Sequence, residues 1–314
     1  MSIAFVFPGQ GSQSVGMLTE LAAESPLVAA TFTEASVVLG YDLWELTQRG
    51  PADALNATER TQPAMLAAGI ACWRVWLERG GARPTIVTGH SLGEFTALVA
   101  AEAIGFEQCL RLVAFRGRAM QDAVPPGTGA MAALLGLDDA AVGAACDAAM
   151  QAGGVAEAVN FNSPGQVVIA GDTAAVQRAI EFAKTGGAKR AVLLPVSVPS
   201  HSRLMQPAAN RLAEELRSVE IRTPQIEFRS AVDGNRYAEP ASIRDLLARQ
   251  LVSPVRWTDA VQGLLASGIG KIYECGPGKV LASLCQRIAR GSTTSCASLD
   301  TPAAFAAALT TQTD

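Results

Sequence analysis

The segment Gly89-His90-Ser91-Leu92-Gly93 has the Gly-x-Ser-x-Gly spacing of a nucleophile elbow. In such an elbow a strand turns sharply into a helix, so the serine hydroxyl stands exposed and the next backbone amide points at a developing oxyanion. The positive end of the helix dipole adds to the potential at the same place. The motif therefore predicts that Ser91 is a nucleophile.

A serine nucleophile needs a base to accept its proton, and the chain contains only two histidines, His90 and His201. His90 adjoins Ser91, and neighbouring side chains at a sharp turn point apart, so we interpret His90 as a residue packed beside the elbow. His201 lies in a loop after an apolar strand predicted over 191–198, where catalytic side chains are often placed. By elimination His201 is the predicted base; the alternative is a structural histidine held by hydrogen bonds.

Strands and helices alternate along the chain, which indicates a mostly parallel sheet covered on both faces. Apolar runs predict strands over 3–7, 85–88, 226–232 and 271–275, and helices are predicted over 14–39, 60–80, 92–103 and 106–122. We expect an α/β fold whose larger part is an α/β-hydrolase-like body.

The middle of the chain has a different pattern. It predicts the order β-α-β-β-α-β, with the last strand over 191–198, which is the ferredoxin-like unit. We expect a small subdomain at 127–198, inserted into a large catalytic body formed by 1–126 and 199–314. Ser91 belongs to the body and His201 follows the insertion, so the active site is predicted in the cleft between them.

Composition excludes several classes of protein. The formal net charge is −4 and no basic face is concentrated in the sequence, which argues against a nucleic-acid partner. No long apolar run predicts a membrane span, and the first residues lack the basic start of a signal peptide. The 6 cysteines are scattered, so we expect reduced thiols in a cytoplasmic protein, and two histidines make a metal site improbable.

Seven short motifs follow one another along the chain: FPGQGSQ at 7–13, GHSLGE at 89–94, RGRAMQ at 116–121, NFNSPGQ at 160–166, VPSH at 198–201, Gln250 ahead of PVRW at 254–257, and ECGPG at 274–278. In this order they resemble the motifs of the malonyl-CoA:acyl carrier protein transacylases, over essentially the whole sequence. The resemblance implies a large α/β body with a ferredoxin-like insertion. It also implies transfer of malonyl from malonyl-CoA to holo-acyl carrier protein for fatty-acid biosynthesis, through a malonyl-serine.

The resemblance assigns roles residue by residue. It implies that Ser91 is the nucleophile, His201 the base, and Arg116 the partner of the malonyl carboxylate. The backbone amides of Gln10 and Leu92 would form the oxyanion hole. The backbone carbonyl of Gln250 would orient the histidine.

Other expectations concern the hairpin of two strands predicted within 155–170, the cofactors and the assembly. Asn160 and Asn162 either line the cleft or only form the turn, and with the resemblance lining is favoured. Without the resemblance, the position of Arg116 would indicate a surface residue of the helix predicted over 106–122. We expect no cofactor and no metal, no membrane partner, and a monomer.

Two other functional classes compete with the transferase. A thioesterase or lipase could use the same elbow, but such hydrolases place the histidine near the C-terminus, whereas His201 is mid-chain. A non-catalytic carrier-binding module is disfavoured because the serine, histidine and arginine are all present. Within the transferases, a discrete acyltransferase of polyketide assembly is the nearest alternative.

Overall fold

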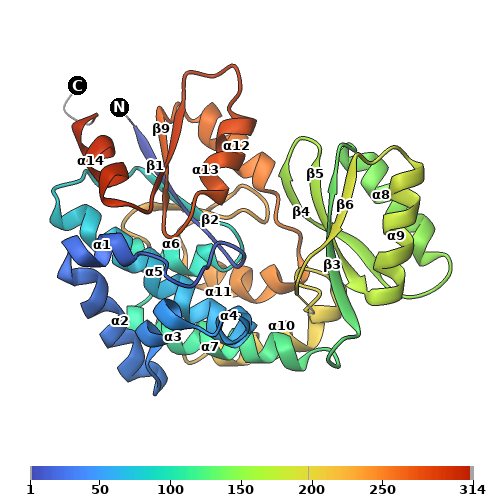
Figure 1. The fold of residues 1–314 in the computed structure, drawn as a ribbon, viewed down its shortest axis with the longest axis horizontal. Helices are drawn as coiled ribbons and strands as arrows, with labels where there is room; N and C mark the ends of the chain where they lie inside the picture. Colours follow the sequence, from blue (N-terminus) through green and yellow to red (C-terminus); the bar gives the residue numbers. More distant parts are fainter. Residues whose placement is uncertain (1, 197, 312–314) are drawn as a thin grey trace.

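The computed structural model describes residues 2–196 and 198–311, and its larger sheet has six strands in the order β10-β9-β1-β2-β7-β8 (Figure 1). Every neighbouring pair is parallel except β7 and β8, which are antiparallel. The strands are β1 (Ile3–Phe7), β2 (Ile86–Gly89), β7 (Glu227–Arg229), β8 (Arg236–Tyr237), β9 (Lys271–Cys275) and β10 (Ser295–Leu299). The short β1, next to the centre, is buried throughout, as expected of a parallel strand covered on both faces.

Helices cover both faces of this sheet. On one face Ala4 and Val6 of β1 pack with α12 (Trp257–Ala266) and α13 (Val280–Ile288). The helices whose buried residues share the opposite core with Phe5 and Phe7 are α1 (Thr19–Glu24), α2 (Pro26–Leu39), α3 (Leu43–Arg49), α4 (Ala52–Asn56), α5 (Thr58–Glu78), α6 (Gly93–Ala100), α7 (Phe106–Asp122), α10 (Gln206–Leu216), α11 (Pro240–Arg249) and α14 (Pro302–Thr310). None of the helices in the described chain has the length and apolar character that crossing a bilayer would require.

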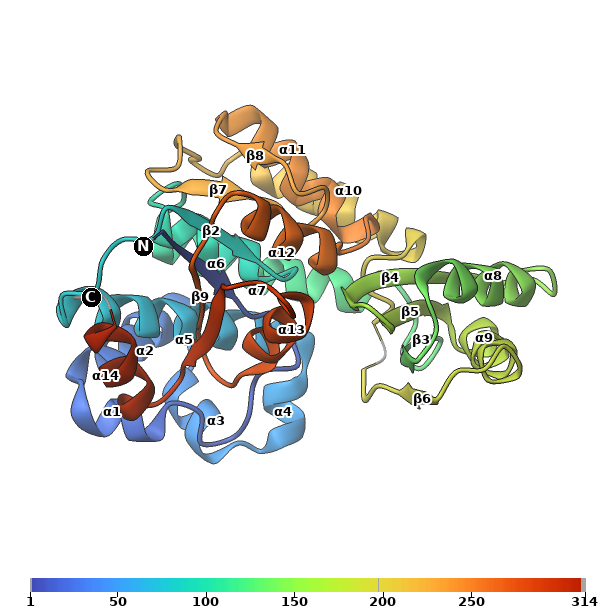
Figure 2. The same cartoon turned by 90° about the horizontal axis from the view of Figure 1, so that it is seen from above.

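A second sheet, of four antiparallel strands, lies to one side of the first (Figure 2). Its order is β4-β5-β3-β6, and α8 and α9 pack on it around a separate apolar cluster. Along the chain the elements are β3 (Gly129–Leu135), α8 (Asp139–Met150), β4 (Ala156–Ser163), β5 (Gln166–Asp172), α9 (Thr173–Thr185) and β6 (Arg190–Leu193). The strand predicted over 191–198 therefore ends early, before Pro195, which has no amide for a ladder; Ser197 lies outside the described residues.

The small sheet is joined to the larger part of the molecule along β4. The Phe161 amide donates to the Val255 carbonyl at 2.9 Å, and the Val255 amide donates to the Val159 carbonyl at 2.8 Å. The Thr258 hydroxyl adds a bond to the Phe161 carbonyl at 3.2 Å. These bonds hold β4 against the segment that leads into α12.

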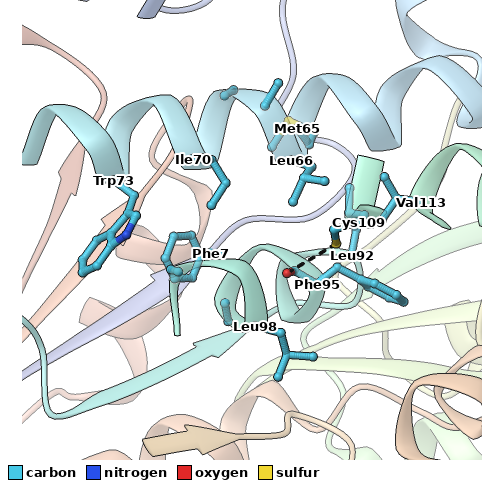
Figure 3. Packing of buried hydrophobic residues seen from close by; sticks show 14 of the residues in the cluster. Phe7, Met65, Leu66, Ile70, Trp73, Leu92, Phe95, Leu98, Cys109 and Val113 are labelled. Carbon is cyan, nitrogen blue, oxygen red and sulfur yellow. Dashed lines mark hydrogen bonds between the residues drawn. The ribbon is translucent and has the colours of Figure 1, made fainter. Parts of the chain in front are cut away.

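The core beneath the elbow is built from three helices and β1 (Figure 3). Phe7 lies among Leu66 and Ile70 of α5 and Leu98 of α6, and each of these side chains is buried. The Cys109 thiol of α7 lies 3.8 Å from the Phe95 carbonyl, so α6 and α7 are in direct contact. This packing gives the start of α6 a rigid support.

Glu274, at the end of β9, is a buried carboxylate outside the elbow region. It is fully buried and accepts from the Ala282 amide at 2.7 Å, while its other oxygen has no hydrogen-bond partner in the described part of the chain. Burial is the main reason that its pKa rises from 4.5 to about 7. The folded state therefore holds this proton at pH values where the unfolded chain has released it.

We expect Glu274→Gln to change how stability depends on pH. Because the folded pKa is raised, the stabilising contribution of Glu274 is fully present below its unfolded pKa and is lost as pH rises toward 7. Relative to the variant, the wild-type protein should lose about 2–3 kcal/mol of unfolding free energy between pH 5 and pH 8. Denaturant unfolding of both proteins at the two pH values measures the change, and a difference that stayed constant with pH would contradict it.

Candidate active site

Ser91 occupies a sharp turn between β2 and α6, as the motif predicts. Its φ of 53° lies in the left-handed region, which costs energy for a residue with a side chain. Leu92 follows in the right-handed helical region, and α6 begins at Gly93. The turn thus places the Ser91 hydroxyl at the amino-terminal end of α6.

The two glycines of the motif are required by close packing. A Cβ on Gly89 would lie 1.9 Å from the carbonyl carbon of Gly93, and a Cβ on Gly93 would lie 1.9 Å from the Phe7 carbonyl oxygen. Both obstacles are backbone atoms, which cannot move aside as a flexible side chain can. The turn itself can therefore close only when position 89 is glycine, and it can pack against the end of β1 only when position 93 is glycine.

His201 meets Ser91 across this turn. Its Nε2 lies 2.8 Å from the Ser91 Oγ, and its Nδ1 lies 2.9 Å from the Gln250 carbonyl and 3.0 Å from the Ser253 carbonyl. Carbonyl oxygens only accept hydrogen bonds, so Nδ1 carries the hydrogen and Nε2 accepts from the serine hydroxyl. Like Ser91, His201 has a left-handed φ, of 67°.

The imidazole is held in its neutral form. His201 is only 4% exposed, and burial, followed by the positive charge of Arg116, lowers its pKa to about 3. A neutral Nε2 can accept the serine proton across the physiological pH range. Two backbone carbonyls orient this imidazole, and among the described residues no carboxylate hydrogen-bonds to it.

Arg116 lies inside the site, not on the surface of α7. Its side chain is 1% exposed, and Nη2 donates to the Ser91 Oγ at 3.2 Å and to the Gln250 Oε1 at 3.0 Å. The guanidinium carbon lies 5.3 Å from the ring centroid of Phe95. Burial lowers the pKa of Arg116 to about 10, so the group remains a cation at neutral pH. Both acceptors of Nη2 are uncharged, and Nε has no partner among the residues that the structure describes, which suits the site to an anionic ligand.

Two backbone amides near Ser91 are available to a ligand. Within the described residues, the amides of Gln10 and Leu92 donate no hydrogen bond to another protein group. The loop of Gln10 approaches the elbow closely, since a Cβ on Gly9 would lie 2.4 Å from the His90 carbonyl oxygen. The geometry suits an oxyanion hole beside the nucleophile.

Asn160 and Asn162 lie within β4, not in the turn that follows it. The Asn162 Oδ1 lies 2.9 Å from the His90 Nε2, so this side chain connects the small sheet to the elbow. His90 also lies 5.6 Å, ring to ring, from Trp257. The interpretation of His90 as a residue packed beside the elbow therefore omitted its hydrogen bond to β4.

A cavity of about 410 Å³ opens above Ser91, between the elbow and the small sheet. Of the eight residues singled out from the sequence, those on its wall are Gln10, Ser91, Leu92, Arg116, Asn160, Asn162 and His201. Gln250 is fully buried and is not among the residues that line the cavity, but it hydrogen-bonds to both His201 and Arg116. The sequence prediction thus identified residues that the fold brings together from distant segments.

The sequence analysis missed two polar residues here, Gln62 and Glu94. Gln62 of α5 lines the cavity; its Nε2 contacts the Met120 sulfur at 3.2 Å, and its Oε1 has no partner within residues 2–196 and 198–311. Glu94 of α6 is fully buried, and its carboxylate accepts a hydrogen bond from the Gln250 side chain. A signal existed for Glu94, which is the charged residue of the mostly apolar segment 93–100, whereas Gln62 follows the polar run 58–61 and does not stand out.

A half-buried serine paired with a buried histidine, beside a fixed cation and on a mostly parallel α/β sheet, is an arrangement suited to acyl transfer. The acyl transferase domain family matches residues 4–300 of the chain.

The relatives narrow this class. The malonyl CoA-acyl carrier protein transacylase of Salmonella typhimurium is 55% identical, with 98% of each chain covered. A malonyl-transacylase solved in complex with its type II PKS acyl-carrier protein is 50% identical, with a TM-score of 0.97 over 99% of this chain and 100% of that one. An acyl carrier protein S-malonyltransferase from Vibrio cholerae is 53% identical, with a TM-score of 0.94 over 98% and 99%. The chain belongs to the family of malonyl CoA-acyl carrier protein transacylases.

Proposed function

We propose that this chain transfers malonyl from malonyl-CoA to the phosphopantetheine thiol of acyl carrier protein, for fatty-acid biosynthesis, through an ester on Ser91. The observation that carries the proposal is the Arg116 guanidinium, buried and 3.2 Å from the Ser91 Oγ. A cation fixed beside the nucleophile can bind the free carboxylate of malonyl while the thioester carbonyl meets the hydroxyl. An acyl group without a carboxylate would leave that cation unpaired.

In the first half-reaction the Ser91 Oγ attacks the thioester carbonyl carbon, and its proton passes to the His201 Nε2. The tetrahedral intermediate collapses, the carbon–sulfur bond breaks, and the proton returns to the departing thiolate of coenzyme A. The 2.8 Å contact and the neutral imidazole support this assignment of His201 as base. The second half-reaction reverses these steps, with the carrier thiol as the attacking group.

The amides of Gln10 and Leu92 are the proposed donors to the intermediate's oxyanion. Such donors act most strongly when they are already in place before charge develops, and each is worth about 3 kcal/mol. Asn160 and Asn162 are proposed to line the path by which the substrate reaches Ser91, since both border the cavity.

We also propose a division of the chain into two domains that meet at the cavity. The small sheet, with its β-α-β-β-α-β order, is assigned to a ferredoxin-like domain at 127–198, and 1–126 with 199–314 to an α/β-hydrolase-like body. Their separate apolar clusters support the division. Acyl carrier protein is the proposed partner, and we place it at the mouth of this cavity; the solved relative is in complex with its type II PKS acyl-carrier protein.

Intact-protein mass spectrometry tests the proposal. After brief incubation with malonyl-CoA, the protein should gain the mass of one malonyl group, and added holo-acyl carrier protein should take that group up. Loss of the label to water without transfer would indicate a hydrolase instead. No label at all would leave only a carrier-binding module.

A further inference from the structure

Glu94 has no role in the proposed reaction, yet it is hydrogen-bonded to Gln250, which contacts both His201 and Arg116. It lies on α6, fully buried, and is absent from the cavity wall. One carboxylate oxygen accepts from the Ser230 hydroxyl at 2.7 Å and from the Ala231 amide at 2.6 Å. The other accepts from the Gln250 Nε2 at 2.6 Å. The carboxylate is thus surrounded by hydrogen-bond donors.

The side chain of Gln250 connects Glu94 to the substrate-facing cation. Its Nε2 donates to Glu94 and to the Ser91 carbonyl at 3.0 Å, which turns its Oε1 toward the Arg116 Nη2. Rotating the amide by half a turn would place its oxygen against two acceptors and its nitrogen against the guanidinium. The Glu94 carboxylate, by the shorter of these two bonds, therefore acts together with the Ser91 carbonyl to fix which end of the amide faces Arg116.

Gln250 also holds the base, but with a different part of the residue. Its backbone carbonyl accepts from the His201 Nδ1 at 2.9 Å, and this bond does not depend on how the amide is turned. A disturbance of the side chain should therefore affect the arginine more than the histidine.

We propose that Glu94 is a positioning residue for malonyl recognition: through the Gln250 amide, it orients Arg116 toward the malonyl carboxylate. This inference rests on the proposed function. The burial of Glu94 supports it, because a carboxylate in this environment is costly unless all its donors are in place. The alternative is that Glu94 only ties α6 to the Ser230–Ala231 segment, which would be a structural role.

Glu94→Gln separates the two roles. Its amide oxygen can still accept from Ser230 and Ala231, but its NH₂ group would face the NH₂ group of Gln250. Either the Gln250 amide keeps its orientation against this repulsion, or it turns, so that Arg116 loses an acceptor and gains a donor as its neighbour and the amide oxygen meets the Ser91 carbonyl. In both cases the support of Arg116 is weakened. We expect kcat/KM for acyl-enzyme formation to fall about 10- to 100-fold with malonyl-CoA, the cost of one hydrogen bond to a charged group. With acetyl-CoA, which does not use the cation, it should change less than about threefold.

Two further variants support the test. Glu274→Gln removes a second buried carboxylate that lies apart from this network, and should leave both rates within about threefold of wild type. Gln250→Leu keeps the backbone carbonyl that holds His201 and should reproduce the malonyl-selective loss.

The double variant Glu94→Gln with Gln250→Leu tests whether the two residues act in series. If Glu94 acts through Gln250, this double variant loses no more activity with malonyl-CoA than Gln250→Leu alone. Should Glu94→Gln fail to fold, Gln250→Leu still decides between a selective and a general loss.

Equal losses with both acyl donors, unchanged rates, or losses that multiply in the double variant would each overturn the inference. These outcomes differ from failure of the proposed function, in which the wild-type protein itself would not load malonyl.

Discussion

Ser91→Ala is expected to abolish acyl-enzyme formation: intact-protein mass spectrometry should detect no malonyl adduct, and transfer should fall by at least about 10⁴-fold. The reason is that the hydroxyl oxygen accepts from Arg116 and donates to His201, and alanine has no atom there to form the ester. Alanine can keep the left-handed backbone of the elbow, so the cavity and the arginine remain in place. The variant should still bind malonyl-CoA.

Ser283→Ala is the matched control for this experiment. Ser283 is an exposed serine on α13 whose hydroxyl bonds only within its own helix, to the Lys279 carbonyl. It should load malonyl as the wild-type protein does. An adduct that persisted in Ser91→Ala would place the nucleophile elsewhere.

Arg116→Ala is expected to remove the preference for malonyl. A guanidinium pairs with a carboxylate through two parallel charge-assisted hydrogen bonds, and loss of both costs about 10²- to 10⁴-fold in kcat/KM for malonyl-CoA. Acetyl-CoA carries no carboxylate, so its rate should change little and its relative use should rise. Competition between the two acyl-CoA donors, followed by mass spectrometry of the acyl-enzyme, measures the ratio directly.

The same helix provides the control. Arg118 lies two residues further along α7 and is exposed, so Arg118→Ala removes the same charge without touching the cavity. Arg116→Lys adds a graded case, because a lysine offers a point charge and not a planar fork. If Arg116→Ala kept its malonyl preference, the arginine would have no role in recognition.

Local signals predicted the elements around the site well. The helix expected over 106–122 is α7, and the elbow strand expected over 85–88 is β2, one residue later. Apolar periodicity and the glycines of the elbow are properties of neighbouring residues, so a single sequence carries them. The α/β class followed from the same alternation.

Where the chain departs from local preference, prediction was wrong. The helix expected over 14–39 is in fact a loop followed by α1 and α2, because Leu18 adopts a φ of 61° and Pro26 starts a new helix. The pairing of Glu94 with Gln250 joins residues 156 apart in sequence, and that of His90 with Asn162 joins residues 72 apart. Such contacts depend on the tertiary fold, and no spacing along the chain reveals them.

The left-handed conformations of Ser91 and His201 set stability against function. Each costs of order 1–3 kcal/mol that glycine would not incur. A screen for thermostable variants of this protein, scored by melting temperature alone, would therefore favour glycine at these two positions. Such variants would lose both the nucleophile and the base. Selection for turnover is what keeps these two strained residues in place.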